Sequence, residues 1–205
     1  MAYQTEQEKF WAEEFGNEYI ERNQGDKLLA SNLNFFVKAL KQSGNITSCR
    51  EFGANIGMNM KALKLLFPDI KLKGIEINKE ASNELKKTIG EENVFNGSIF
   101  DANVEEKVQL SLIKGVLIHI NPDMLPLVYD KLYHSSMKYI LIAEYYNPLP
   151  VTISYRGHQD RLFKRDFAGE FLKKFPDTEL IDYGFAYRND PAFPQDDITW
   201  FLIKK

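Results

Sequence analysis

Apolar residues recur along the chain in a helical spacing before residue 46 and in shorter, strand-like runs after it. In two early segments apolar residues lie three and four positions apart, as on one face of an amphipathic helix. The first segment carries Phe10, Trp11, Phe15, Tyr19 and Ile20, and the second carries Leu28, Leu29, Leu33, Phe36, Val37 and Leu40. The pattern predicts two helices that each pack one face inward.

From residue 46 onward, apolar runs typical of strands alternate with helical patterns. The expected strands are residues 46–52, 71–77, 93–95, 108–113 and 139–144, and the expected helices are residues 58–67, 79–89, 121–135 and 166–175. Strands and helices that alternate with short loops between them indicate a parallel, doubly wound α/β sheet.

The end of the chain departs from this alternation. Two further strand patterns, residues 180–187 and 198–204, are joined by turn-rich residues without a helical pattern. A parallel pair needs a crossover of a dozen or more residues, so this connection predicts a hairpin. The last of seven strands is therefore expected to run antiparallel. The segment 145–165 carries no clear pattern and is expected to be a long loop.

Length, charge and cysteine content narrow the class of protein. A chain of 205 residues fits one domain, which we divide into an N-terminal helical lid (1–45) and a Rossmann-like core (46–205). The net charge of −3 and the scattered basic residues argue against nucleic acid as a partner. The single Cys49 cannot form an internal disulfide, and no apolar run approaches 18 residues. We expect a soluble, cytoplasmic protein with no membrane partner.

A glycine-containing turn is the most informative local feature. Residues 51–57 read Glu-Phe-Gly-Ala-Asn-Ile-Gly and lie between an expected strand and an expected helix. Glycine at such a turn lets the backbone approach a ligand closely. Glu76 ends the next expected strand, 76 − 57 = 19 residues beyond Gly57. An acidic residue about 20 residues after such a turn is placed to accept hydrogen bonds from ribose hydroxyls.

The spacing of the glycines distinguishes between nucleoside cofactors. A dinucleotide fingerprint that starts at Gly53 needs glycine at 55 and glycine or alanine at 58, where Asn55 and Met58 stand. The pattern E-x-G-x-x-x-G instead resembles the first motif of class I S-adenosylmethionine (SAM) methyltransferases. This resemblance implies SAM as the cofactor, with contacts from Glu51, Gly53, Ala54, Asn55, Gly57, Glu76 and Ile77. A plain strand-to-helix turn, as in any α/β fold, is the alternative interpretation.

Ligands of such open sheets lie beyond the carboxyl ends of the strands, where the strand order reverses. Ser98 and Ile99 follow the third strand, where methyltransferases usually flank the adenine. Lys114 ends the fourth strand, and its backbone is expected beside the amino-acid part of SAM. His119 comes five residues later, and with an ordinary pKa near 6.5 it is our candidate to take a proton from the acceptor. A structural histidine in an apolar run is the alternative.

The acceptor side is expected in the segment after the fifth strand. Tyr146, Tyr155 and Arg156 lie there, and the arginine is suited to hold a carboxylate or phosphate through forked hydrogen bonds. The tyrosines are suited to cover a sugar ring. The same residues are also compatible with a solvated loop held by tyrosine packing. The three histidines show no metal-ligand spacing, so no metal is expected.

Three segments together resemble one small family. Residues 10–23, 51–57 and 114–122 make the chain similar to the methylases associated with pseudaminic acid biosynthesis. The resemblance implies methylation of a nonulosonic acid, its nucleotide-activated form or a late sugar precursor. It also implies that Tyr19, Arg22 and Asn23 fold over the cofactor or acceptor as part of a lid. From the sequence pattern alone, these three residues are the polar end of an amphipathic helix.

The sequence thus predicts a Rossmann-like class I methyltransferase fold and a SAM-dependent methyltransferase with a sugar or nucleotide-sugar acceptor. A non-catalytic SAM-binding or assembly protein is one alternative. An NAD-dependent sugar-modifying enzyme is another, and it is disfavoured by the missing glycines and by Met137 four residues after Tyr133, where a Tyr-x-x-x-Lys pair needs lysine. The acceptor atom, the need for a general base, the oligomeric state and the pathway step stay open.

Overall fold

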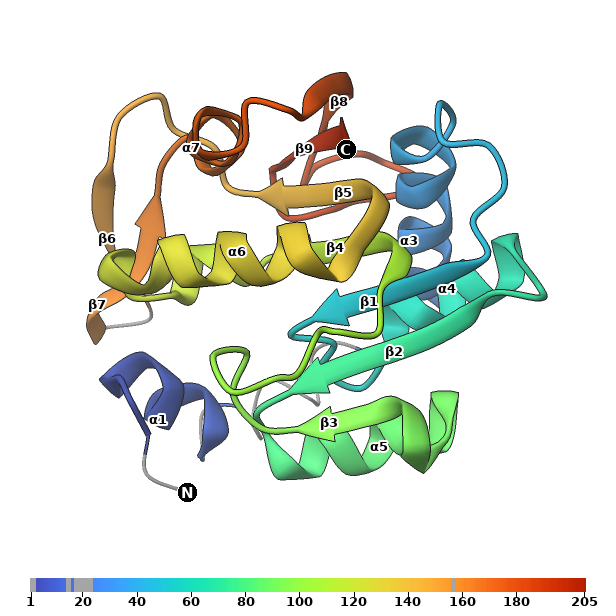
Figure 1. Cartoon of the computed structure of the whole chain (residues 1–205), viewed down its shortest axis with the longest axis horizontal. Coiled ribbons are helices and arrows are strands. Elements are labelled where there is room, and N and C mark those ends of the chain that lie inside the picture. The colour runs from blue at the N-terminus through green and yellow to red at the C-terminus, as the bar shows by residue number, and fades with distance from the viewer. Residues whose placement is uncertain (1–2, 14–15, 17–23, 156–157) are drawn as a thin grey trace.

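A seven-stranded sheet forms the centre of the computed structural model, which describes residues 3–13, 16, 24–155 and 158–205 (Figure 1). Only the backbone is described for residues 155 and 158–161. The α-helices are α1 Glu6–Ala12, α3 Asp26–Ala39, α4 Met58–Leu66, α5 Lys79–Ile89, α6 Leu125–Ser135 and α7 Phe167–Lys174. The strands are β1 Ser48–Phe52, β2 Lys71–Glu76, β3 Val94–Asn96, β4 Val108–Lys114, β5 Ser136–Glu144, β6 Val151–Tyr155, β7 His158–Lys164, β8 Glu179–Ala186 and β9 Ile198–Lys204.

The topology of the main sheet confirms the prediction. The strand order is β3-β2-β1-β4-β5-β9-β8, and β9 runs antiparallel to both of its neighbours while the other strands are parallel to one another. β8 and β9 form the expected hairpin. Strand order reverses between β1 and β4, so a ligand is expected beyond the carboxyl ends of these two strands.

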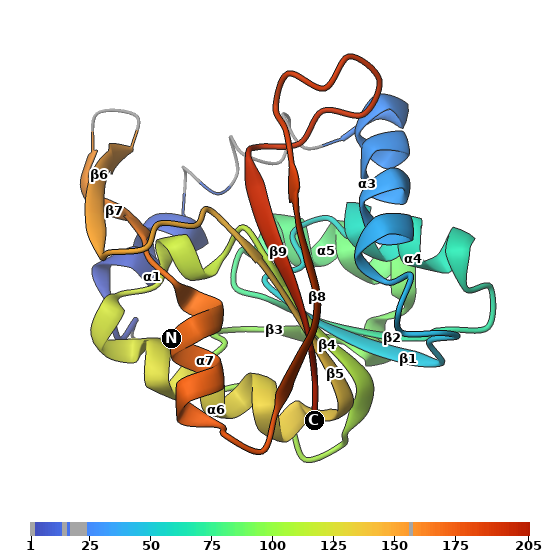
Figure 2. The same cartoon turned by 90° about the horizontal axis from the view of Figure 1, so that it is seen from above.

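Alternate residues along the central strands bury into two cores, one on each face of the sheet. Leu110 and Leu112 of β4 pack on the side of α3, α4 and α5, whereas Ile113 packs on the side of α6 and α7. The two groups of helices lie on opposite sides of the sheet (Figure 2). Burial on both faces explains why the sequence of β4 reads as a nearly continuous apolar run.

Capping residues fix where the helices begin. The side-chain oxygen of Asn78 accepts a hydrogen bond from the Ala81 N–H at 2.9 Å and so starts α5. Asp166 does the same for α7 through the Gly169 N–H, at 2.8 Å. Asn121 caps a short 3-10 turn, Pro122–Met124, that leads into α6. The helix expected from residue 121 therefore begins as a 3-10 turn and becomes α-helical at Leu125.

Two expectations were wrong. The segment expected to be a loop contains an antiparallel hairpin, β6–β7, whose tip, residues 156–157, lies outside the described residues. Residues 151–155 do alternate apolar and polar side chains, but residues 158–164 show no period of two, so no partner strand for β6 was visible in the sequence. The first helix is shorter than expected, because α1 ends at Ala12 and the backbone of Glu13 is not helical. Residues 14–15 and 17–23, which include Tyr19, Arg22 and Asn23, lie outside the described residues.

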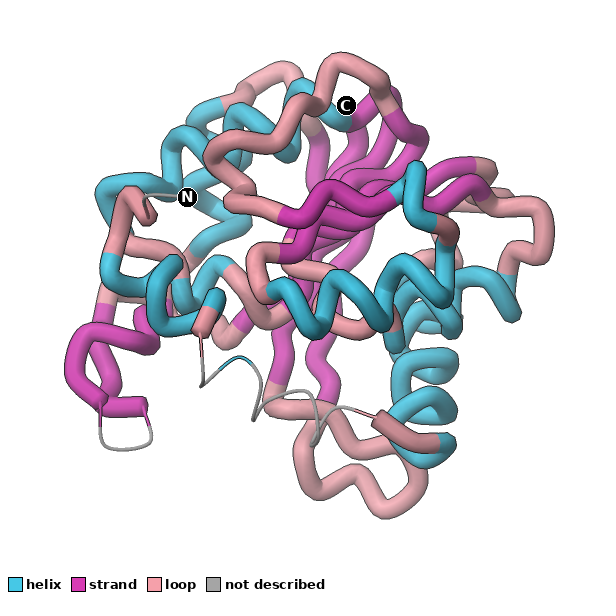
Figure 3. The backbone as a smooth tube through the Cα atoms, turned by 90° about the horizontal axis from the view of Figure 1, so that it is seen from below, coloured by secondary structure: helices cyan, strands magenta, loops and turns pink. Residues whose placement is uncertain are grey.

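α1 and the β6–β7 hairpin lie together on one side of the molecule, away from α3 (Figures 1 and 3). Strand β7 contacts the 3-10 turn Leu117–His119 that follows β4, and Leu162 of β7 is buried there in the α6/α7 core. The hairpin thus supports the turn that carries His119.

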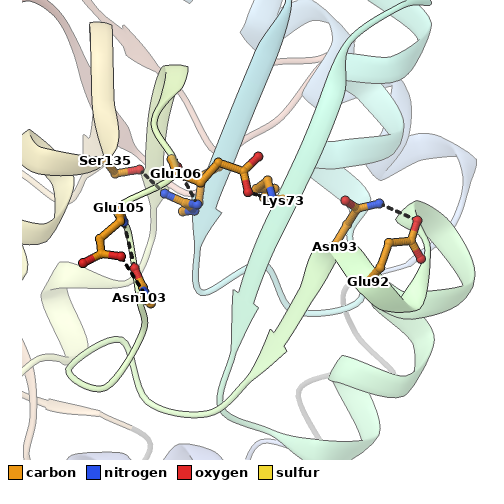
Figure 4. A network of polar contacts seen from close by, with 8 residues as sticks. Lys73, Glu92, Asn93, Asn103, Glu105, Glu106 and Ser135 are labelled. Carbon is orange, nitrogen blue, oxygen red and sulfur yellow. Dashed lines mark hydrogen bonds and ion pairs between the residues drawn. The ribbon is translucent and has the colours of Figure 1, made fainter.

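At the amino ends of the strands, opposite the glycine turn, polar side chains form a separate network (Figure 4). Arg50 is 5% exposed and donates hydrogen bonds to the Ser135 Oγ and to the Glu106 carbonyl oxygen, both at 2.8 Å. Lys73 forms an ion pair with the Glu106 carboxylate at 2.6 Å. These contacts satisfy a buried guanidinium far from the cavity described below.

Candidate functional site

A cavity opens beyond the carboxyl ends of β1, β2 and β4, and helix α1 forms one of its walls. Predicted cofactor residues that line it are Gly53, Ala54, Asn55, Glu76, Ile77, Ser98, Ile99 and Lys114, together with the candidate base His119. Glu51 and Gly57, which were also predicted to contact the cofactor, are not among the residues that line the cavity. Residues that line it without having been predicted include Thr5, the N-cap of α1, Gln7, Glu8 and Trp11 of α1, Asn32 of α3, and Asn59 of α4.

The glycine turn is left-handed at three positions. Gly53 and Gly57 have φ of +77° and +85°, and Asn55 has φ of +47°. A Cβ atom on Gly53 would lie 2.6 Å from the Cγ2 atom of Val116. Gly53 is therefore required both by its backbone conformation and by the close approach of the segment after β4. Gly57 begins α4.

Glu76 joins the glycine turn to the loop after β2. One carboxylate oxygen accepts the Asn55 N–H at 2.7 Å, and the other accepts the Asn78 N–H at 2.8 Å. The residue is 8% exposed and faces the cavity. Burial raises the pKa of Glu76, while hydrogen bonds from the N–H groups of Asn78, Asn55 and Ile77 favour its charged form. A carboxylate has about four lone-pair sites, so Glu76 keeps capacity to accept a further hydrogen bond.

Unpartnered polar atoms gather where β1 ends. The Asn59 amide donates to one oxygen of Glu51 at 2.5 Å. Within the described part of the chain, Glu51 Oε2, Asn55 Oδ1 and Asn59 Oδ1 are buried without a hydrogen-bond partner. Burial raises the pKa of Glu51 to about 8, partly offset by the Asn59 hydrogen bond and the charge of Lys114. Buried acceptors without partners are rare in proteins, and here two of the three belong to residues that line the cavity, Asn55 and Asn59.

Lys114 brings a positive charge to the same end of the cavity. Its ammonium group lies 5.3 Å from the centre of the Phe35 ring. Burial lowers the pKa of Lys114, and the charge of Glu51 opposes this shift. The prediction concerned the backbone at this position, and the structure adds a side chain that lies by Phe35 and interacts with the charge of Glu51.

Glu144, at the end of β5, was not identified from the sequence as a site residue. One of its oxygens accepts the N–H groups of Val116 and Leu117, both at 2.9 Å, and so fixes the start of the turn that carries His119. The residue is 2% exposed, and burial raises the pKa of Glu144 to about 7. Its position at the end of an apolar strand was visible in the sequence, but its partners belong to the segment that follows another strand, β4.

His119 lies against the N-terminal helix. Its imidazole packs on the Trp11 indole with ring centres 4.4 Å apart and the planes inclined by 52°. His119 is 9% exposed and lines the cavity with Trp11. The two residues are separated by most of the cofactor-binding half of the chain, and the sequence alone indicated no contact between them.

The remaining predicted residues lie at the edges of the cavity or outside it. Ser98 accepts the Phe100 N–H at 3.0 Å, and Ser98 and Ile99 are both buried in the cavity wall. Tyr146 is 43% exposed, packs beside Phe201 and is not among the residues that line the cavity. The side chain of Tyr155 and the whole of Arg156 lie outside the described residues. No cluster of potential metal ligands occurs among residues whose positions are described.

Within the same described ranges, no helix is long and apolar enough to cross a membrane. A search of protein-family models gave no match, and a search of curated proteins gave none either.

Solved structures with the same fold are methyltransferases. The 1,6-didemethyltoxoflavin-N1-methyltransferase of Burkholderia thailandensis, solved with its acceptor and S-adenosylhomocysteine (SAH), matches with a TM-score of 0.76 at 13% identity over 100% of this chain and 91% of that chain. Magnesium protoporphyrin IX methyltransferase from Synechocystis, with bound SAM, matches with a TM-score of 0.68 at 8% identity over 100% of both chains. Mitomycin 7-O-methyltransferase matches with a TM-score of 0.67 at 15% identity, over 100% of this chain and 62% of that chain. The protein therefore has the class I SAM-dependent methyltransferase fold.

Proposed function

We propose that the protein is a SAM-dependent methyltransferase that acts on a small polar acceptor, with a sugar or nucleotide-sugar in nonulosonic acid biosynthesis as the specific candidate. The position of Glu76 carries the proposal. In a methyltransferase fold, this buried carboxylate faces the cavity at the end of β2 and keeps capacity to accept a further hydrogen bond. Two ribose hydroxyls are donors that match it.

The other end of the cavity fits an amino acid. The unpartnered oxygens of Glu51, Asn55 and Asn59 suit an ammonium group, and the Lys114 ammonium suits a carboxylate. SAM contains both groups in its methionine part, along with an adenosine whose ring would meet Ser98 and Ile99. NAD contains no amino acid, and its pyrophosphate would face the carboxylates of Glu51 and Glu76.

When bound, SAM would supply a methyl group on a positively charged sulfur, which an acceptor lone pair could attack with the thioether SAH as the leaving group. The residues of this chain then have three tasks. The glycine turn and Glu76 orient the cofactor, and α1 with Trp11 excludes water from one side. His119, which Glu144 and β7 hold in place through its turn, takes the acceptor proton.

The sugar-like acceptor rests on the sequence resemblance and on residues around the methyl end. Tyr146 is an exposed aromatic residue two positions after the end of β5, outside the cavity lining itself. The hairpin β6–β7, which carries Tyr155 and leads into Arg156, contacts the His119 turn through β7. Small-molecule acceptors are also named for structures with this fold, including 1,6-didemethyltoxoflavin and mitomycin. We retain a cytoplasmic location, because the single Cys49 is a buried free thiol.

Two measurements test the proposal. Calorimetric titration with SAM, SAH and NAD is expected to show binding of the first two alone. Incubation with SAM and fractionated sugar nucleotides, followed by mass spectrometry, is expected to show a product heavier by one methyl group. Binding of SAH without turnover of any acceptor would favour a non-catalytic SAM-binding protein, and binding of NAD in place of SAH would contradict the proposal.

A further inference from the structure

Asn78 connects the loop after β2 to two other parts of the structure. The residue is 3% exposed, and its N–H donates to Glu76 at 2.8 Å. Its side-chain oxygen caps α5 through the Ala81 N–H, at 2.9 Å. These two contacts use the backbone donor and the side-chain acceptor. The side-chain amide of the same residue is a donor, and it contacts another part of the structure.

That amide faces the end of α1. The Asn78 Nδ2 atom lies 3.5 Å from the carbonyl oxygen of Trp11, 3.4 Å from that of Ala12 and 3.5 Å from that of Glu13. The last carbonyls of a helix have no partner within the helix, so they need donors from outside. Although each contact is long, together they give three terminal carbonyls of α1 a shared donor.

Gly16 provides an independent sign that this junction is tight. A Cβ atom at Gly16 would lie 2.0 Å from the Trp11 carbonyl oxygen and 2.7 Å from the Asn78 Nδ2 atom. A larger residue at position 16 would therefore push the end of α1 away from the Asn78 amide.

A second polar contact holds the other end of α1. The Gln4 side-chain amide donates to the Asp101 carboxylate at 3.1 Å. Asp101 belongs to the loop after β3, and Asn78 to the loop after β2, so both ends of α1 contact loops that border the cavity. Between them, Trp11 packs on His119.

We propose that Asn78 is a positioning residue that holds α1 over the cavity and links this closed position to Glu76. A ligand enters or leaves when the amide releases the carbonyls of α1, and the aromatic pair Trp11 and His119 separates with it. That Asn78 holds α1 follows from the contacts alone. That release of α1 controls ligand exchange rests on the proposed function, since the ligand is SAM or SAH.

The test separates the contact with α1 from the cap of α5. Asn78→Ser keeps a side-chain acceptor for the cap and removes the amide donor. Asn78→Asp also keeps the acceptor and places a carboxylate against three carbonyl oxygens. Hydrogen–deuterium exchange is expected to be about five- to tenfold faster in α1 for the serine variant, on the scale of one lost hydrogen bond, and faster again for the aspartate variant. Exchange in α5 should stay within twofold of wild type.

Two further variants complete the experiment. Asn93→Asp is a matched control, because the Asn93 amide donates to the carbonyl of Ile89 at the end of α5 at 2.7 Å, away from α1. It should leave α1 unchanged. Gly16→Ala should speed exchange in α1 by disrupting the same junction with Asn78 intact. Unchanged exchange in α1 for Asn78→Ser, Asn78→Asp and Gly16→Ala would overturn the proposal.

The ligand arm uses SAH as the probe. The dissociation rate of SAH, measured by displacement with a competing ligand, is expected to be several-fold higher in Asn78→Ser than in wild type. An SAH dissociation rate equal to wild type, with faster exchange in α1, would show that α1 does not control ligand release and would overturn that part. If wild-type protein fails to bind SAH, the proposed function fails, while the exchange experiment still decides whether Asn78 holds α1.

Discussion

The Asn55 N–H donates a hydrogen bond to the Glu76 carboxylate at 2.7 Å, across 21 residues of sequence. This bond joins the left-handed turn after β1 to the end of β2, so the two predicted nucleoside-binding elements act as one unit. Asn55 adopts φ of +47°, which asparagine tolerates better than most residues. This left-handed backbone conformation, which would be strained for most other residues, therefore directs the Asn55 N–H at the Glu76 carboxylate.

Replacement of Glu76 is expected to weaken every ligand that contains the adenosine ribose. Glu76→Ala should cost about 1.5 to 3 kcal/mol in binding of both SAH and 5′-methylthioadenosine, because hydrogen bonds to a charged group contribute on this scale. Calorimetry measures both ligands, and circular dichroism confirms that the variant is folded. An unchanged dissociation constant in a folded variant would show that Glu76 serves the protein's own loops alone.

Lys114→Met should distinguish the two ends of the cofactor. SAH has an amino-acid carboxylate and 5′-methylthioadenosine has none, so we expect roughly tenfold weaker SAH binding, the scale of a charge-assisted hydrogen bond. Binding of 5′-methylthioadenosine should stay within threefold. Lys131→Met is the matched control, because the Lys131 ammonium donates to the Ala102 carbonyl at 2.7 Å and is not part of the cavity lining. Equal weakening of both ligands by Lys114→Met would contradict the assignment.

His119→Ala is expected to lower methyl transfer by on the order of 10²- to 10⁴-fold if the imidazole takes the acceptor proton. SAH affinity should stay within about threefold. The change also removes the ring that packs on Trp11, so the fluorescence of the variant should differ from wild type. His134→Ala serves as a control, because His134 is exposed on α6. Wild-type turnover of the true acceptor by His119→Ala would assign the residue a structural role.

Glu51→Gln should change how stability depends on pH. Burial raises the pKa of Glu51 from its ordinary 4.5 to about 8, so the folded protein binds this proton more tightly than the unfolded chain. The stabilisation is complete below pH 4.5 and is lost as pH rises toward 8. Urea denaturation at pH 5 and pH 8 should therefore show that the variant gains free energy of unfolding relative to wild type at the higher pH, by about 1 kcal/mol or more. A pH-independent difference would contradict the assigned shift.

Alanine substitutions at Gly53 and Gly115 distinguish the cost of a left-handed backbone from the cost of a steric clash. Gly53→Ala places a Cβ atom 2.6 Å from Val116 at φ of +77°, whereas Gly115→Ala, at φ of +68°, meets no atom within 4 Å. We expect Gly115→Ala to cost about 1 kcal/mol in free energy of unfolding and Gly53→Ala to cost clearly more. The double variant Gly53→Ala, Val116→Ala should recover part of the difference. Equal costs for the two single variants would show that Val116 moves aside freely.

The local pattern of the chain determined most of the architecture. Lys79–Ile89 and Ile198–Lys204 have the bounds that the sequence predicted, because an amphipathic period and an apolar run record burial directly. The antiparallel last strand followed from a connection too short for a crossover. The hairpin β6–β7 lies outside the main sheet, and only residues 151–155 show a strand-like alternation, so the pattern did not reveal that residues 158–164 pair with them.

The sequence also indicated the cofactor end of the site, because the glycine turn and Glu76 depend on local backbone conformation and a fixed interval. The contacts among distant elements required the tertiary structure. Trp11 meets His119, Glu144 holds the turn after β4, and Asn78 contacts α1, and each contact joins residues from separate elements. No period or spacing records such pairs, because strand order and the path of α1 are set by packing of the whole chain.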